Sequence, residues 1–239
     1  MINIKKIVVT GGSGRFAQSL KKTKSKYNFI YPSRTKLDIT KLGSILKFLK
    51  KTKPHAVLHL AGLSRPMKNH DKKIAKSISL NIIGTSNLVN ACSKLKIKLV
   101  YFSTSYVYPG SNGNYTEKDP VLPWNNYAWS KLGGECAVQM YKNSLILRVC
   151  MTENPFLHKK AFANVKLNFI FHEDLAKILI KILNKKGVIN LGGPTKTVYN
   201  FAKKYNKKVK SIKAKALLGK NIPLKHSMNL KKLHKIIND

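Results

Sequence analysis

A short apolar run that ends in a glycine-rich turn is the feature that most constrains this fold. Residues 6–10 read Lys-Ile-Val-Val-Thr, and Gly-Gly-Ser-Gly-Arg-Phe-Ala follows at positions 11–17. A β-branched run closed by glycines is typical of a buried parallel strand. Glycines let the backbone turn tightly and approach a pyrophosphate, which the N–H groups of the following helix then bind. The segment predicts a dinucleotide-binding turn, with a plain structural turn as the alternative. The binding residues expected here are Gly11, Gly14, Arg15, Phe16 and Ala17.

Strands and helices alternate along almost the whole chain. Further strands are predicted at residues 28–31, 56–60, 98–102, 145–149 and 187–191, and helices at 15–22, 39–51, 71–95, 124–140 and 172–183. This alternation, without an internal repeat, predicts an α/β fold with a Rossmann-type, doubly wound parallel sheet. We expect an NAD(P)-binding domain over residues 1–150. An abbreviated substrate-binding region over 151–239 would be interwoven with it rather than independent.

The residues after the second predicted strand indicate which dinucleotide is bound. An NAD enzyme usually has an acid at the end of this strand, which holds the ribose hydroxyls. Here the strand ends in Tyr-Pro-Ser33-Arg34 without an acid, and only four of the 46 basic residues are arginine. Because Arg34 can pair with a 2′-phosphate and Arg15 can lie beside it, two arginines at these loops favour a role in binding over surface decoration. We therefore expect NADP(H) to be favoured, with NAD(H) as the second option.

Tyr127 and Lys131 are spaced so that both lie on one face of a predicted helix. A nearby ammonium favours the phenolate, which would lower the pKa of Tyr127 from its free value of about 10. Thr104 follows a predicted strand and offers a hydroxyl at the end where ligands of parallel sheets bind. The three side chains place an acid, a cation and a hydroxyl near the predicted cofactor.

Taken together, several segments resemble the extended short-chain dehydrogenase/reductase superfamily, also known as the NAD-dependent epimerase/dehydratase family. They are TGGSGRFA, LDIT, HLAG, NIIGTSNLVNAC, FSTSYVYPG, NNYAWSKLGGE and LILR. Within the superfamily, the run from STSYVYPG to NNYAWSKLGGE is most similar to the dTDP-4-dehydrorhamnose reductases. The resemblance is dense over residues 5–150 and looser beyond them.

The resemblance implies a role for each matching residue. Tyr127 matches the catalytic acid, Lys131 the residue that binds the nicotinamide ribose and lowers the tyrosine pKa, and Thr104 the hydroxyl that orients the substrate carbonyl. Asn81 matches an asparagine that steadies the central helix and strand, with a plain bond from the helix to a neighbouring loop as the alternative. The further cofactor contacts implied are Ser33, Arg34, Asp38, Ile39, Ala61, Gly62 and Leu63.

The implied function is an NADPH-preferring reductase of a 4-keto-6-deoxy nucleotide sugar. Two alternatives stay open: an epimerase or dehydratase with bound NAD, and a non-catalytic cofactor-binding protein with a regulatory or RNA-associated role. The chain departs from the family in two places. Ser105 stands where an acid is usual, and the segment between Arg148 and His172 is short and lacks an aromatic–glycine turn. The cofactor half of the family pattern is thus intact, and the substrate half is abbreviated.

The charge balance does not predict a specific nucleic-acid partner. The chain carries 46 basic and 9 acidic residues, a net charge of +37. The cations are mainly lysines spread along the chain, without the arginine and aromatic clusters of nucleic-acid sites. A lysine-decorated surface is the simpler interpretation.

Cysteine and histidine positions predict neither a disulfide nor a metal site. Three cysteines lie far apart, which fits a reducing compartment. We expect His59, on a predicted strand, to be a hydrogen-bonded core histidine rather than a ligand. No apolar stretch reaches the roughly 18 residues of a membrane span, and we see no signal peptide. We therefore expect a cytoplasmic protein without a membrane partner, and leave a homodimer open.

Overall fold

The computed structural model describes residues 4–218 and 222–238. Its centre is a six-stranded sheet in the order β10-β5-β4-β3-β1-β2, with every neighbouring pair parallel. The strands are β1 (Lys6–Thr10), β2 (Asn28–Ile30), β3 (Ala56–His59), β4 (Lys98–Thr104), β5 (Ser144–Val149) and β10 (Gly187–Leu191). The predicted Rossmann-type α/β fold is confirmed. The strand order reverses at β1, because β2 and β3 pair on opposite sides of it, and such a switch point opens a crevice for ligands.

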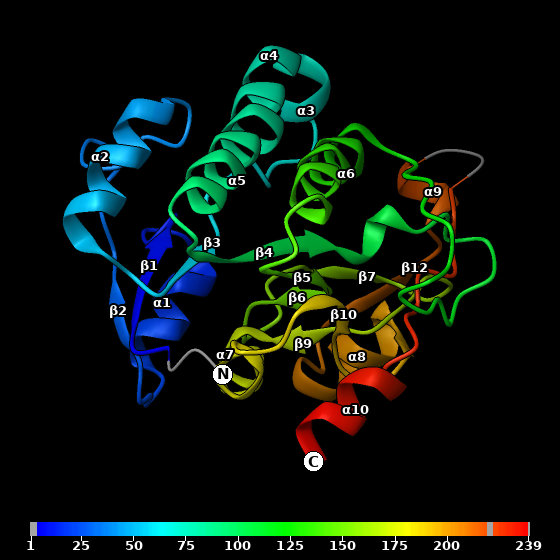
Figure 1. The fold of residues 1–239 in the computed structure, drawn as a ribbon. Coiled ribbons are helices and arrows are strands. Elements are labelled where there is room, and N and C mark those ends of the chain that lie inside the picture. Colours follow the sequence, from blue (N-terminus) through cyan, green and yellow to red (C-terminus); the bar gives the residue numbers. More distant parts are fainter. Residues whose placement is uncertain (1–3, 219–221, 239) are drawn as a thin grey trace.

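Helices cover both faces of the sheet (Figure 1). One layer contains α1 (Arg15–Lys22), α7 (His172–Ile182) and α10 (Lys231–Asn238), and the other contains α2 (Leu42–Thr52), α5 (Gly84–Lys94) and α6 (Asn126–Gln139). Successive residues of a strand point to opposite faces. Ile7 and Val9 accordingly join the core beneath the first layer, while Val8 joins the core beneath the second. Burial on both faces explains the unbroken apolar run of β1.

The helix predicted over residues 71–95 is not continuous, so this prediction is wrong in detail. The segment consists of α3 (Asn69–Lys72), α4 (Ile74–Ser77), a π-helix (Ile78–Ile83) and α5. Lys73, with φ −130° and ψ 54°, breaks the first turn. The π-helical segment contains the buried Asn81, and π-turns often occur at functional sites. An apolar periodicity does not distinguish a helix with such a turn from a regular one.

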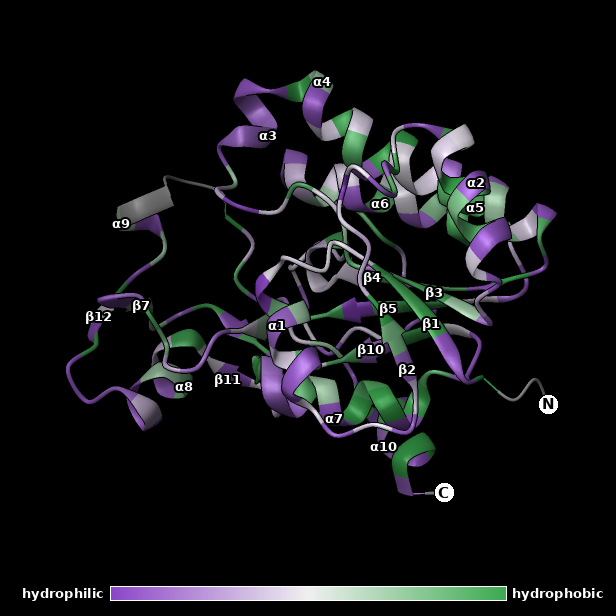
Figure 2. Cartoon of the chain, turned by 90° about the vertical axis from the view of Figure 1, so that its left-hand side faces the viewer, coloured by the Kyte–Doolittle hydropathy of each residue, from purple (hydrophilic) through white to green (hydrophobic). Residues whose placement is uncertain are grey.

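The C-terminal part builds a second, smaller core beside the sheet. It contains three short strand pairs: β6 (Met151–Thr152) with β9 (Ile170–Phe171), β7 (Lys160–Phe162) with β12 (Lys210–Ile212), and β8 (Lys166–Leu167) with β11 (Lys196–Thr197). The helices α8 (Val198–Tyr205) and α9 (Lys215–Leu218) complete it. In Figure 2 the central strands are mostly hydrophobic. From this same half of the chain, β10 and α10 return to the main sheet and its helix layer.

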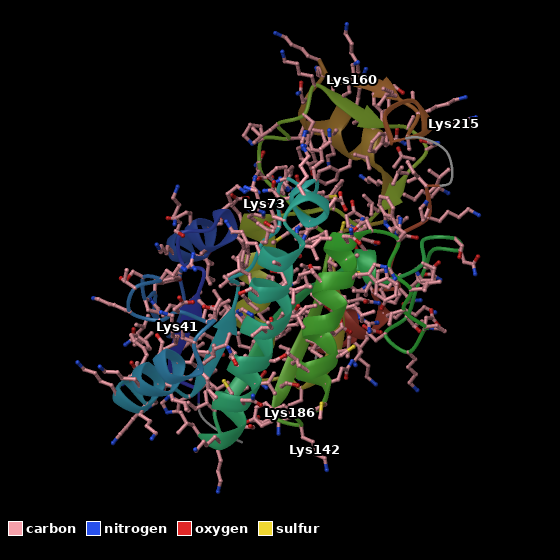
Figure 3. All side chains as sticks on the ribbon, turned by 90° about the horizontal axis from the view of Figure 1, so that it is seen from above. Lys41, Lys73, Lys142, Lys160, Lys186 and Lys215 are labelled. Carbon is pink, nitrogen blue, oxygen red and sulfur yellow. The ribbon has the colours of Figure 1, made fainter. Side chains whose placement is uncertain are left out.

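Lysine side chains project outward from many separate segments. Figure 3 labels six of them on well-separated segments of the chain, namely Lys41, Lys73, Lys142, Lys160, Lys186 and Lys215. Within residues 4–218 and 222–238, no helix is long and apolar enough to cross a membrane.

Candidate active site

A cavity of about 1570 Å³ lies at the carboxyl ends of the central strands. It brings together every residue that the sequence predicts for catalysis or cofactor binding. These are Gly11, Gly14, Arg15, Phe16, Ala17, Ser33, Arg34, Asp38, Ile39, Ala61, Gly62, Leu63, Thr104, Tyr127 and Lys131. Their roles in binding or catalysis stay predictions.

The glycine-rich turn connects β1 to α1 in a form that only glycine accommodates. Gly11 has φ +74°, and a Cβ at this position would lie 2.6 Å from the backbone nitrogen of Ala61. The N–H of Gly14 donates to the Gly11 carbonyl at 2.9 Å, and α1 begins at the next residue. Among the described side chains none caps this helix, and its first turn has no acid. The N–H groups at its start are therefore available to an anion.

The far end of the cavity contains an arginine and an acid. The Arg34 Nε lies 3.9 Å from Asp38 Oδ2. The other carboxylate oxygen, Oδ1, accepts hydrogen bonds from the Thr40 N–H at 3.0 Å and hydroxyl at 2.8 Å. These bonds, with Arg34 and Lys41, hold the pKa of Asp38 below its usual value. The sequence places no acid at the end of β2, but Asp38 lies four residues after Arg34 in the same loop and faces it.

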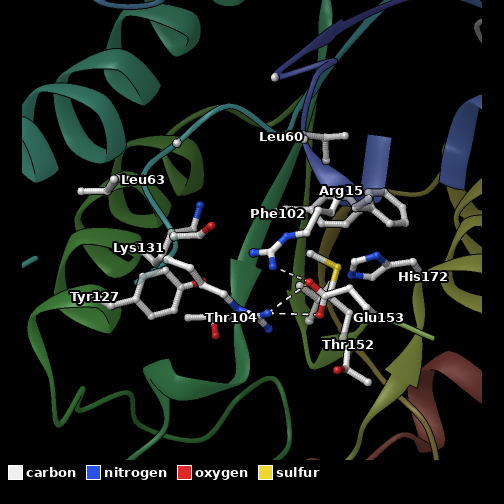
Figure 4. Close-up of a pocket in the computed structure, with 18 of the residues that line it drawn as sticks. Arg15, Leu60, Leu63, Phe102, Thr104, Tyr127, Lys131, Thr152, Glu153 and His172 are labelled. Atoms are coloured by element: carbon white, nitrogen blue, oxygen red, sulfur yellow. Dashed lines mark hydrogen bonds and ion pairs between the residues drawn. The ribbon is translucent and has the colours of Figure 1, made fainter. Parts of the chain in front are cut away.

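Tyr127, Lys131 and Thr104 form the opposite wall (Figure 4). Thr104 is the last residue of β4, and the other two lie on α6, whose N-terminus is capped by the Asn125 side chain. The Thr104 side chain lies close enough to the Tyr127 phenol to act on its pKa. The Lys131 Nζ lies 4.1 Å from the centre of the Tyr101 ring, and the Tyr101 hydroxyl donates to the Lys131 carbonyl at 2.9 Å. The ring therefore positions both ends of Lys131.

The protonation states differ from the expectation based on spacing. Burial raises the pKa of Tyr127, and the Thr104 side chain and the charge of Arg65 only partly oppose this rise. Burial lowers the pKa of Lys131 to about 7. The expectation that Lys131 lowers the Tyr127 pKa is thus wrong for this structure, because desolvation dominates both groups. At neutral pH the phenol carries its proton.

Asn81 joins the π-helix to the loop after β3. Its Oδ1 accepts from the Leu63 N–H at 2.7 Å, and its Nδ2 donates to the Leu63 carbonyl at 2.9 Å and to the Ser130 hydroxyl at 2.8 Å. The side chain thereby ties a cavity-lining loop to α6. The bond to a neighbouring loop is the one that the simpler interpretation describes, and the role of Asn81 in steadying the central helix and strand stays a prediction.

The expectation for His59 is confirmed. The buried ring is bonded at Nδ1 by Thr10 Oγ1 at 2.8 Å and at Nε2 by Thr85 Oγ1 at 3.0 Å. Thr85 donates its own proton to the Asn81 carbonyl, so Nε2 of the histidine is the donor and Nδ1 the acceptor. Burial, together with the charge of Lys131, lowers the pKa of His59 to about 3.

Sequence reasoning missed an ion-pair cluster in the same cavity. The Glu153 carboxylate contacts the guanidinium groups of both Arg15 and Arg65. The only sequence signal was the scarcity of arginine, since all four arginines of this lysine-rich chain make ion pairs with acids. The remaining wall comes from the C-terminal part and includes Phe156, His158, Lys160, Phe162, Phe169 and His226.

A parallel sheet with a glycine-rich turn after β1 and a Tyr-x-x-x-Lys pair on α6 defines the extended short-chain dehydrogenase/reductase class. The chain belongs to one family of that class, the RmlD substrate binding domain family, which matches residues 5–186.

Comparison with individual proteins gives modest identities. The chain is 24% identical over 200 residues to a dTDP-4-dehydrorhamnose reductase of Aggregatibacter actinomycetemcomitans, covering 80% of this chain and 63% of that protein. It is 27% identical over 143 residues to the methionine adenosyltransferase 2 subunit beta of Rattus norvegicus, covering 56% and 42%. The chain thus spans less than two thirds of the length of these relatives.

The fold likeness extends further than the sequence likeness. The structure of a dTDP-4-dehydrorhamnose reductase from Bacillus anthracis in complex with NADP superposes with a TM-score of 0.85 at 20% identity. That superposition covers 97% of this chain and 92% of the other. The short C-terminal part is therefore included in the shared fold.

Proposed function

We propose that this protein binds NADPH and reduces the keto group of a 4-keto-6-deoxy nucleotide sugar. One observation carries the proposal: the Tyr127–Thr104 pair and Lys131 face the glycine-rich turn across one cavity. Membership of the RmlD substrate binding domain family and the NADP complex of a reductase with the same fold support it.

The residues present fit a dinucleotide. The turn at Gly11 leaves no space for a side chain, and α1 directs its N-terminal N–H groups toward a phosphate position. Arg34 would hold a 2′-phosphate, and Lys131 would contact the nicotinamide ribose. When bound, the nicotinamide would supply the hydride.

Tyr127 would supply the proton. Its pKa is raised by burial, so the phenol is protonated at neutral pH and suited to donate to a carbonyl oxygen that gains negative charge. Thr104, which lines the same cavity, would hold that oxygen in line. The direction of the pKa shift therefore favours reduction, which consumes a proton.

The two parts of the chain would divide the work. We infer that residues 1–150 hold the cofactor and residues 151–239 form the wall that faces the sugar nucleotide; the end positions 1–3 and 239 lie outside the described residues. Lys160 and Phe162 on β7 line that wall. A lysine and an aromatic ring there suit a diphosphate and a base.

The test is turnover with defined substrates. Purified protein is mixed with NADPH and a dTDP-4-keto-6-deoxyhexose, and NADPH absorbance and the nucleotide sugars are followed, the latter by mass spectrometry. We expect one NADPH consumed for each sugar reduced. Purification with NAD⁺ bound at nearly one per chain, and turnover independent of NADPH, would instead identify an epimerase or dehydratase. Dinucleotide binding without turnover on any keto sugar would favour the non-catalytic alternative.

A further inference from the structure

One acidic side chain binds two arginines inside the cavity. The Glu153 carboxylate contacts Arg15, and Arg65 Nη1 lies 3.2 Å from its Oε1 and 3.1 Å from its Oε2. The side chain of Glu153 is 16% exposed, against 53% for Arg15. Figure 4 shows Arg15 reaching from α1 toward Glu153, with Tyr127, Lys131 and Thr104 on the other side.

The three partners come from three separate walls of the cavity. Arg15 is the first residue of α1, Arg65 lies in the loop after β3, and Glu153 follows β6. Burial acts to raise the pKa of Glu153, but the charges of Arg65 and Arg15 outweigh it and hold the pKa below its usual value. The carboxylate is therefore ionised at neutral pH, and it lies against the helix that begins at the predicted phosphate site.

We propose that Glu153 is a displaceable carboxylate, which competes with the phosphate groups of the dinucleotide for Arg15. The proposal rests on the dinucleotide binding of the proposed function. A guanidinium binds carboxylate and phosphate through the same planar pair of N–H groups, so Arg15 can exchange one for the other. The N-terminus of α1 brings the phosphate to the same place.

Arg65 makes the exchange possible without leaving a charge unpaired. A partly buried carboxylate that loses its only partner is costly. Here Arg65 keeps both of its contacts to Glu153 when Arg15 turns to the phosphate. The cluster thus has two arrangements with every charge compensated. The carboxylate weakens dinucleotide binding and speeds its release, a useful property in an enzyme that must exchange its cofactor in every cycle.

The experiment compares Glu153→Gln with the wild type. Glutamine keeps the shape of the side chain and removes its charge. The matched control is Glu173→Gln, which makes the same change in net charge at an exposed position on α7. Dissociation constants for NADPH are measured by fluorescence titration, and those for inorganic pyrophosphate by calorimetry. Circular dichroism verifies that each variant is folded.

We expect Glu153→Gln to bind both NADPH and pyrophosphate about tenfold more tightly, the effect of about 1.4 kcal/mol, while Glu173→Gln stays near the wild type. Glu153→Asp is the second variant. It keeps the charge but is one methylene too short to hold both arginines. It should also bind NADPH and pyrophosphate more tightly than the wild type, but by a smaller factor than Glu153→Gln. Unchanged or weaker binding by Glu153→Gln would overturn the proposal.

The measurements need no sugar substrate, so they separate this inference from the proposed reductase. Tighter binding by Glu153→Gln in a protein that reduces no keto sugar would support the displaceable carboxylate and reject the reductase. Failure of the wild type to bind either NADPH or pyrophosphate would reject both.

Discussion

The carboxylate of Glu135 binds the guanidinium of Arg148 at 2.7 Å in the core, on the side of α6 that also carries Tyr127 and Lys131. Both side chains are buried, and Glu135 lies one helical turn beyond Lys131. The Ser103 hydroxyl donates to the other carboxylate oxygen, and Arg148 donates to the Tyr108 hydroxyl at 2.8 Å. The pair therefore ties α6, which carries the two predicted catalytic residues, to β4 and β5.

Removing one charge of this pair should destabilise the fold. Glu135→Gln leaves the Arg148 guanidinium buried without an ionised partner, a change that typically costs about 3–5 kcal/mol. We expect a loss of that size in the free energy of unfolding measured with urea. Exposed Glu173→Gln removes an acid from the first turn of α7 and should cost at most about 1 kcal/mol. Equal effects of the two variants would show that the buried pair does not stabilise α6.

Tyr127→Phe should abolish turnover and leave the cofactor affinity close to the wild-type value. The substitution removes the proton donor but keeps the ring, and positioned proton transfer typically contributes about 10²- to 10⁴-fold in rate. Lys131→Met should lower the rate and also weaken cofactor binding. The measurements are the rate of NADPH oxidation and the dissociation constant of NADPH. Full activity in Tyr127→Phe would show that the proton comes from another group.

Lys131 should make stability depend on pH in the alkaline range. The folded protein gives up the lysine proton at a pKa of about 7, whereas the unfolded chain keeps it up to about 10.5. Between these values the unfolded state binds more protons, so the free energy of unfolding rises with pH. Urea denaturation at pH 7 and pH 9 should therefore show the wild type gaining stability relative to Lys131→Met. If the free energies of unfolding of the wild type and Lys131→Met differ by the same amount at both pH values, the lowered pKa of Lys131 is contradicted.

Local sequence patterns predicted those parts of the site whose residues lie close together in the sequence. The turn at Gly11 follows from glycines directly after an apolar run, and the shared face of Tyr127 and Lys131 follows from their spacing. The Arg65–Glu153 contact joins residues 88 positions apart, and no pattern in the neighbourhood of either residue encodes it. The same holds for the π-helical segment around Asn81, whose side chain bonds Leu63, 18 positions away in the sequence.

Protonation states were predictable only in part for the same reason. Spacing places the Lys131 ammonium near the Tyr127 phenol, but desolvation decides both pKa values, and desolvation depends on what the whole fold packs around them. The sequence alone could not supply that burial.

Arg34 should decide which dinucleotide this protein prefers. A hydrogen bond between charged groups contributes about 1.5–3 kcal/mol. The Arg34 side chain is 73% exposed and already faces Asp38 at 3.9 Å, so solvent and the acid reduce this contribution. We therefore expect NADPH to bind about tenfold more tightly than NADH, the effect of about 1.4 kcal/mol.

Arg34→Asp should reverse the order, because a second carboxylate repels a 2′-phosphate and accepts from ribose hydroxyls. Arg34→Gln, the neutral control, should only remove the preference, and Asp38→Asn should strengthen it by freeing Arg34 from its acid. Fluorescence titration of each variant with NADPH and NADH gives the ratios. If Arg34→Asp weakens both cofactors equally, Arg34 contacts a group they share, and the preference has another origin.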